Sequence, residues 1–156
     1  MQNYIKSQTR LAFVQYIFQS EFLNSDTSES IEDFQKHFYN SNIAIIDEKK
    51  EFKLKFNKNY LKKLFDNYNS NFNKNITIED LNNFIQINRK FEKWDNILKS
   101  LLFAVISELQ ITNEKKIKIV LNDYLNISKS LVSEKETKLI NAIIQKYLDK
   151  NEIEKE

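Results

Sequence analysis

The sequence of 156 residues contains no cysteine, no glycine and no proline, and these absences exclude several kinds of site. Without cysteine there is no disulfide, no thiolate nucleophile and no zinc-finger pattern. Without glycine there is no glycine-rich phosphate loop, which removes the P-loop and dinucleotide-binding classes. Long apolar runs are lacking too, since no window approaches the ~18 uncharged apolar residues of a membrane span. We therefore expect a cytoplasmic protein with no membrane partner.

Candidate catalytic groups are equally scarce. His37 is the only histidine, so a metal site would find no second histidine and no cysteine to complete it. Carboxylate pairs such as Glu134 and Glu136 stand at expected helix starts, where negative charge favours the helix dipole. We expect no enzyme activity, no metal and no cofactor.

The charge is nearly balanced, with a formal net charge of +2. Positive charge is concentrated in two places. Residues 1–20 carry Lys6 and Arg10 and no acid, and residues 49–63 carry seven lysines against Glu51 alone. Such runs are usually a solvated face. They permit an RNA partner without requiring one.

What the sequence does contain is a regular series of helix signals. Apolar periodicity and capping residues predict helices over residues 4–23, 26–39, 57–68, 77 onward, 92–110, 113–131 and 133–148. The expected N-caps are Asn57 or Asn59, Thr77 with Asp80, Asn113, and Ser133 with Glu136. Within residues 42–56, apolar residues at Phe52, Leu54 and Phe56 alternate with lysine. This segment is expected to form a loop or a short extended piece. The pattern predicts a compact all-α bundle.

We expect one domain over residues 1–150 and a charged, frayed tail over residues 151–156. Two of its helices, residues 11–18 within the first and residues 97–109, are apolar on most sides and should be buried.

Four polar residues interrupt or border the apolar runs and are expected to be structural: Gln15, Glu108, Asn122 and Asn141. A buried amide or carboxylate needs a hydrogen-bond partner, because leaving it unpaired costs a few kcal/mol. Arg10, next to the apolar run, is open to a second interpretation, contact with a phosphate or a base, which suits its forked guanidinium.

The order and spacing of several segments resemble the NusB family. The register includes Lys6, Thr9-Arg10, Val14-Gln15 and Phe18 near the start. It continues with Asp95, Ile97-Leu98-Lys99 and Glu108-Leu109 in the central helix, then Leu121-Asn122-Asp123, and ends with the run Lys138-Leu139-Ile140-Asn141-Ala142-Ile143-Ile144. Residues 6–23 and 88–147 carry the resemblance. The middle third is similar only in helix content.

The resemblance implies a seven-helix fold of two subdomains without catalytic activity. It also implies a transcription antitermination factor that binds boxA-type RNA together with the ribosomal protein NusE, joins the RNA polymerase elongation complex and supports ribosomal RNA transcription. Carried over by position, Lys6, Arg10 and Lys138 would contact RNA. Tyr16 and Phe18 are candidates for stacking on bases, with a core role as the alternative.

The chain departs from the family pattern where Phe103 replaces a frequent arginine and where the N-terminus has one lysine and one arginine in place of an arginine-rich segment. Fewer phosphate contacts imply weaker RNA binding. An alternative is therefore a NusB-like protein–protein adaptor without specific RNA binding. A related fold also forms the N-terminal domain of ribosomal RNA cytosine methyltransferases, but we expect no catalytic domain after the last helix. A homodimer remains possible.

Overall fold

The computed structural model describes residues 3–22, 42–44, 51–53, 55–84 and 93–155. These residues form six α-helices, one 3-10 turn and one short hairpin, which confirms the all-α class. The elements are α1 (Asn3–Phe22), β1 (Asn42–Ala44), β2 (Glu51–Lys53), α3 (Lys58–Ser70), α4 (Lys74–Phe84), α5 (Asn96–Gln110), η2 (Glu114–Lys116), α6 (Ile117–Leu131) and α7 (Glu134–Lys155).

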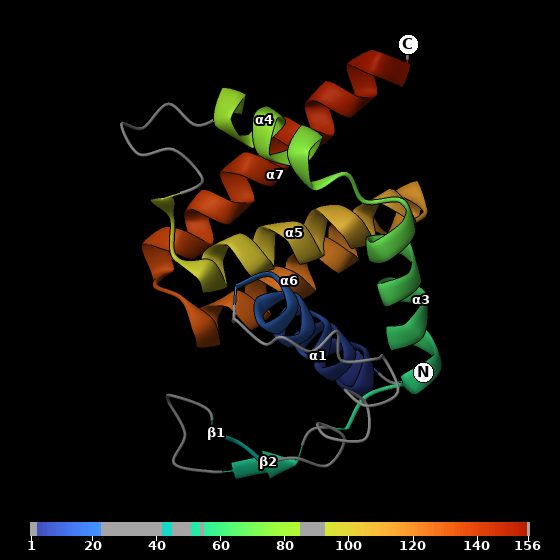
Figure 1. Ribbon diagram of the computed structural model, residues 1–156, viewed down its shortest axis with the longest axis vertical. Coiled ribbons are helices and arrows are strands. Elements are labelled where there is room, and N and C mark those ends of the chain that lie inside the picture. Colours follow the sequence, from blue (N-terminus) through green and yellow to red (C-terminus); the bar gives the residue numbers. More distant parts are fainter. Residues whose placement is uncertain (1–2, 23–41, 45–50, 54, 85–92, 156) are drawn as a thin grey trace.

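Helix α5 lies at the centre of the bundle, with α1, α3, α6 and α7 around it (Figure 1). Leu98 and every residue from Ser100 to Leu109 are buried. This confirms that the central helix is apolar on most sides. Removal of so many side chains from water makes α5 the main source of hydrophobic stabilisation.

Helix α1 packs against α5 and α3 and completes the core. Ala12, Phe13 and Ile17 are fully buried. The Phe13 ring meets Phe65 and Tyr68 of α3 edge-on, with centroids 6.1 and 6.0 Å apart. Edge-to-face geometry is a favourable arrangement of aromatic rings. The helix expected over residues 4–23 is therefore confirmed as far as Phe22, the last described residue of α1, and its apolar run is the part that enters the core.

Two N-caps illustrate what local sequence determines. Asn57 caps α3, since its Oδ1 accepts the backbone N–H of Tyr60 at 2.9 Å. The prediction that Thr77 starts the next helix is wrong: α4 begins at Lys74, where Asn73 Oδ1 accepts the N–H of Ile76. Thr77 is a buried residue within the helix and donates its hydroxyl to the carbonyl of Asn73.

Helices α6 and α7 form a helical hairpin with a short connection. Asn113 caps the 3-10 turn η2, which leads into α6. Ser133 and Glu136 form the expected capping box: Glu136 N donates to Ser133 Oγ, and Ser133 N donates to Glu136 Oε1, both at 3.1 Å. The last helix continues to Lys155, beyond the end expected at residue 148.

Residues 42–44 and 51–53 pair as antiparallel strands, with Ile43 opposite Phe52, so the expected extended piece is present. The helix expected over residues 26–39 lies outside the described residues, as does the start of the helix expected from residue 92. In the part of the chain that is described, no helix has the length and apolar character needed to cross a membrane.

Candidate functional site

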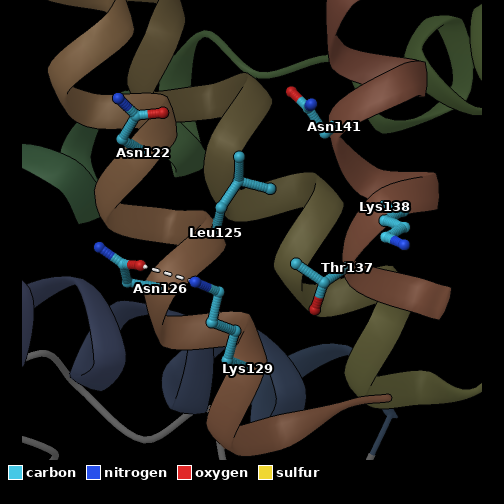
Figure 2. Close-up of a pocket in the computed structure, with 7 residues that line it drawn as sticks. All are labelled: Asn122, Leu125, Asn126, Lys129, Thr137, Lys138 and Asn141. Atoms are coloured by element: carbon cyan, nitrogen blue, oxygen red, sulfur yellow. Dashed lines mark hydrogen bonds between the residues drawn. The ribbon is translucent and has the colours of Figure 1, made fainter. Parts of the chain in front are cut away.

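An open groove runs between the outer sides of α6 and α7 (Figure 2). Its volume is about 360 Å³. It is lined by Asn122, Leu125, Asn126 and Lys129 from α6 and by Thr137, Lys138 and Asn141 from α7. Most of these residues are spaced three or four apart, which places them on one side of each helix.

The lining combines amides with lysines. Asn122, Asn126 and Asn141 are exposed, so their amides remain accessible as donors and acceptors. Lys129 Nζ donates to Asn126 Oδ1 at 3.4 Å on the same helix. Lys138 pairs with Glu134 at 3.6 Å, but both side chains are more than three-quarters exposed. Such a surface pair contributes little, so Lys138 can exchange this partner for an external anion.

The groove has a rigid floor. Below the exposed residues, the hydroxyl oxygens of Ser128 and Thr137 lie 2.9 Å apart and are hydrogen-bonded across the two helices. Both residues are buried. This contact holds α6 and α7 at a fixed spacing. The width of the groove therefore depends on buried, packed residues.

A buried polar network lies under the neighbouring part of α6, centred on Glu108 of α5. The Glu108 side chain is fully buried, and its carboxylate accepts from Arg10 Nε at 3.0 and 3.1 Å. It also accepts from the hydroxyls of Tyr60 and Tyr124, each at 2.7 Å. Four helices therefore meet at one carboxylate, and its lone pairs are satisfied without water.

Arg10 is the second centre of this network. Its Nη1 donates to Asp123 of α6, its Nη2 lies 2.9 Å from Glu108, and its side chain is 6 % exposed. Burial alone would lower the pKa of the Arg10 guanidinium. The hydrogen bond and the charge of Glu108, together with the hydrogen bond to Asp123, outweigh burial and raise this pKa above its ordinary value.

The expectation that Arg10 contacts RNA stays a prediction, and the structure gives its guanidinium two partners inside the protein, Glu108 and Asp123. Nε and Nη2 of Arg10 contact Glu108, and Nη1 contacts Asp123. To bind a phosphate, Arg10 would have to break this buried ion pair, which is strongly unfavourable. Arg10 joins α1 to α5 and α6. Glu108 and Asp123 lie 98 and 113 positions away from Arg10 in the sequence. The pattern of neighbouring residues therefore could not decide its role.

Ser7 brings the start of α1 next to the groove. Its hydroxyl donates to Asp123, and Asp123 directly follows the groove residue Asn122. Lys6 is the preceding residue and is half-buried. The expected RNA contacts Lys6 and Lys138 lie at the start of α1 and on the α7 side of the groove, on two helices that both contact α6.

The remaining candidates have other surroundings. Tyr16 is half-buried, with its ring centroid 4.0 Å from that of Phe65, and belongs to the edge of the core. Phe18 and Gln15 are also half-buried on α1. Asn122 and Asn141, which were expected to be structural polar residues, are exposed.

Sequence reasoning missed several residues of the groove and the network. The groove residues that it missed are Leu125, Asn126, Lys129 and Thr137. The network residues that it missed are Tyr60 and Tyr124, which donate to Glu108, and Asp123, which pairs with Arg10. The spacing of Asn122, Asn126 and Lys129 was a usable signal for an exposed polar side. Nothing local marks the tyrosines as partners of a distant carboxylate.

Among the described residues, no three histidine, cysteine, aspartate or glutamate side chains gather in a way that would hold a metal. His37 lies outside those residues.

Comparison with known proteins identifies a family. The model of the NusB family matches residues 7–149. The transcription antitermination protein NusB of Rickettsia massiliae is 28 % identical over 141 residues, covering 90 % of this chain and 89 % of its own. The protein of the same name from Rickettsia typhi is 30 % identical over 146 residues, covering 94 % and 92 %. No solved structure is a significant match. The chain therefore belongs to the NusB family.

Proposed function

We propose that this protein is an RNA-binding transcription antitermination factor, and that single-stranded RNA lies in the groove between α6 and α7. The observation that carries this proposal is the lining of that groove. Exposed amides suit the edges of splayed bases, because an amide offers both donor and acceptor. Lys129 and Lys138 suit phosphates, and the floor below them is held by buried hydroxyls.

Membership of the NusB family supports a proposal for the partners. The relatives are named as transcription antitermination proteins. We propose that this chain binds boxA-type RNA together with the ribosomal protein NusE, and that the pair joins the RNA polymerase elongation complex during ribosomal RNA transcription in a bacterial cytoplasm. In this proposal the protein is one seven-helix domain of two subdomains over residues 1–150, is not an enzyme, and needs no cofactor.

The RNA contacts are redistributed relative to the expectation from sequence. We propose Lys6, Lys129 and Lys138 as phosphate contacts, with Asn122, Asn126 and Asn141 facing the bases. Arg10 instead positions the start of α1 through Asp123. Tyr16 and Phe18 act mainly by packing, since both are half-buried.

A protein–protein adaptor is the second candidate. Ile119 of α6 is 66 % exposed and lies one turn before Asn122. A partner protein on this face would cover Ile119, although single exposed apolar residues are common at protein surfaces. In addition, Arg10 is withdrawn into the core, so α1 offers the RNA only Lys6 among its basic side chains. A homodimer through this region is a further possibility within the adaptor proposal.

The test is an anisotropy titration of boxA-like and scrambled strands with the wild-type protein and the double variant Asn122→Ala/Asn126→Ala. The matched control is Asn69→Ala/Asn75→Ala, which removes two exposed amides elsewhere. We expect the groove variant to lose the preference for boxA, because base contacts provide specificity. The control should keep it. Equal binding of both strands by the wild type would contradict the proposal and favour the adaptor.

A further inference from the structure

A second basic surface lies at the beginning of α3. Lys55, Lys58, Lys62 and Lys63 are all exposed, and no acidic residue occurs between positions 55 and 63. We call these four residues the α3 lysine patch. They stand at the N-terminal end of a helix, where the aligned peptide dipoles add further positive potential. On a chain with a net charge of +2, this is a marked local concentration of positive charge.

Three of the four lysines of the patch have no ion-pair partner among the described residues. The three are Lys55, Lys62 and Lys63, whereas Lys74 and Lys150 elsewhere each take part in an ion pair. Like charges close together are unfavourable without counter-ions. Binding of a polyanion releases these counter-ions and relieves the repulsion.

The patch adjoins the start of α1. The backbone N–H of Lys55 donates to Gln8 Oε1 at 2.7 Å, and that of Asn57 donates to Thr9 Oγ1 at 2.9 Å. In Figure 1 the N-terminal end of α1 lies beside the beginning of α3. The opposite side of the same α1 segment contacts α6 through Ser7 and Asp123, next to the groove.

We infer that the α3 lysine patch binds the backbone phosphates of RNA that flanks the segment held in the α6–α7 groove. The strand would leave the groove, cross the end of α1 at Lys6 and reach the patch. Lysine acts as a flexible point charge, so these contacts strengthen binding without reading the sequence. This inference rests on the proposed function, because it concerns the same RNA.

The experiment compares a boxA-like strand alone with the same strand carrying single-stranded extensions at either end. The variant Lys62→Gln/Lys63→Gln is measured against the control Lys93→Gln/Lys146→Gln. The control removes two exposed lysines, one just before the start of α5 and one on α7. Affinity is measured by anisotropy over a series of salt concentrations. Thermal melting of both variants checks that each remains folded.

We expect the extension to tighten binding by the wild type and the control, and the patch variant to lose this gain. Because each phosphate contact on a single strand contributes a slope of about 0.7 in log K against log salt, two lost contacts should reduce the slope by about 1.4. The preference for boxA over a scrambled strand should stay intact in the patch variant.

The failures are distinguishable. An unchanged salt slope in the patch variant, with boxA preference present in the wild type, overturns this inference and leaves the proposed function standing. If the slope is unchanged but NusE no longer tightens RNA binding, the patch is a protein contact and the inference is again wrong. No RNA binding by the wild type overturns both.

Discussion

Arg10 and Glu108 show how one pair of residues holds distant parts of the chain. The pair joins α1 to α5, and Asp123, Tyr60 and Tyr124 extend the contact to α6 and α3. The Arg10 guanidinium carbon also lies 5.8 Å from the centre of the Tyr124 ring, which is within cation–π range. A charged pair placed this deep is costly to desolvate, and it is tolerated because every strong acceptor has a donor.

Replacing Glu108 with glutamine tests this role. Glu108→Gln removes the negative charge that faces Arg10 and leaves the guanidinium with Asp123 alone. We expect the free energy of unfolding to fall by about 3–5 kcal/mol, the usual cost of removing one partner of a buried pair. Urea denaturation measures the change. The control Glu79→Gln, at an exposed site on α4, should stay within about 0.5 kcal/mol of wild type. A loss of under 1 kcal/mol at Glu108 would contradict the network.

The two tyrosines that donate to Glu108 predict a loss of stability in alkali. Burial first, and then the negative charge of Glu108, raise the pKa of Tyr60 and Tyr124 above the ordinary tyrosine value. An unfolded phenol ionises near pH 10, so above that pH the folded state retains protons that the unfolded state has lost. The free energy of unfolding should therefore fall as the pH rises past about 10, by up to about 1.4 kcal/mol per pH unit for each tyrosine.

Substitution separates this effect from general alkaline denaturation. Tyr124→Phe removes one phenol of the network, so its free energy of unfolding should decline less steeply above pH 10 than that of the wild type. Tyr4→Phe, at a site 55 % exposed, is the control and should follow the wild-type slope. Chemical denaturation at several pH values gives both slopes. Equal slopes in Tyr124→Phe and wild type would show that the Tyr124 proton is not held by the fold.

At the scale of elements, the sequence predicted helix starts that depend on residues close together in the chain. The Asn57 cap and the Ser133–Glu136 capping box depend on residues three apart, and both are present. Thr77 failed as a helix start because Asn73, four positions earlier, provides the cap instead. Asn73 and Thr77 are both good capping residues, so the local sequence does not decide at which of them the helix begins. Packing decides it, because Thr77 is buried within the helix.

The groove and the network were predictable only in part for a related reason. Periodicity identified Glu108 as a polar residue in a buried helix, but not the tyrosines and the arginine that hold it. Asn122 and Asn141 were identified as unusual, yet their exposure depends on how α6 and α7 are rotated against the core. That rotation is set by contacts such as Ser128 with Thr137, which join residues of different helices.

At the scale of the whole molecule, the start of α1 connects the two surfaces that we propose to bind RNA. One side of it contacts α6 beside the groove, and the other contacts the beginning of α3 beside the lysine patch. The net charge of +2 does not reveal the positive charge at these surfaces, because it also counts the acidic residues Glu108 and Asp123. Both of these pair with Arg10. In the proposed function, the lysines that remain at the surface are the groups that face the RNA phosphates.

The most direct test of the central claim is photocrosslinking of thiouridine-substituted boxA-like RNA, followed by mass spectrometry of the crosslinked peptides. The account predicts crosslinks concentrated in residues 122–129 and 137–141, on the two sides of the groove, and their loss in excess unlabelled boxA but not in excess scrambled strand. Crosslinks confined to α4 or to the C-terminal part of α7, or competed equally by both strands, would contradict it.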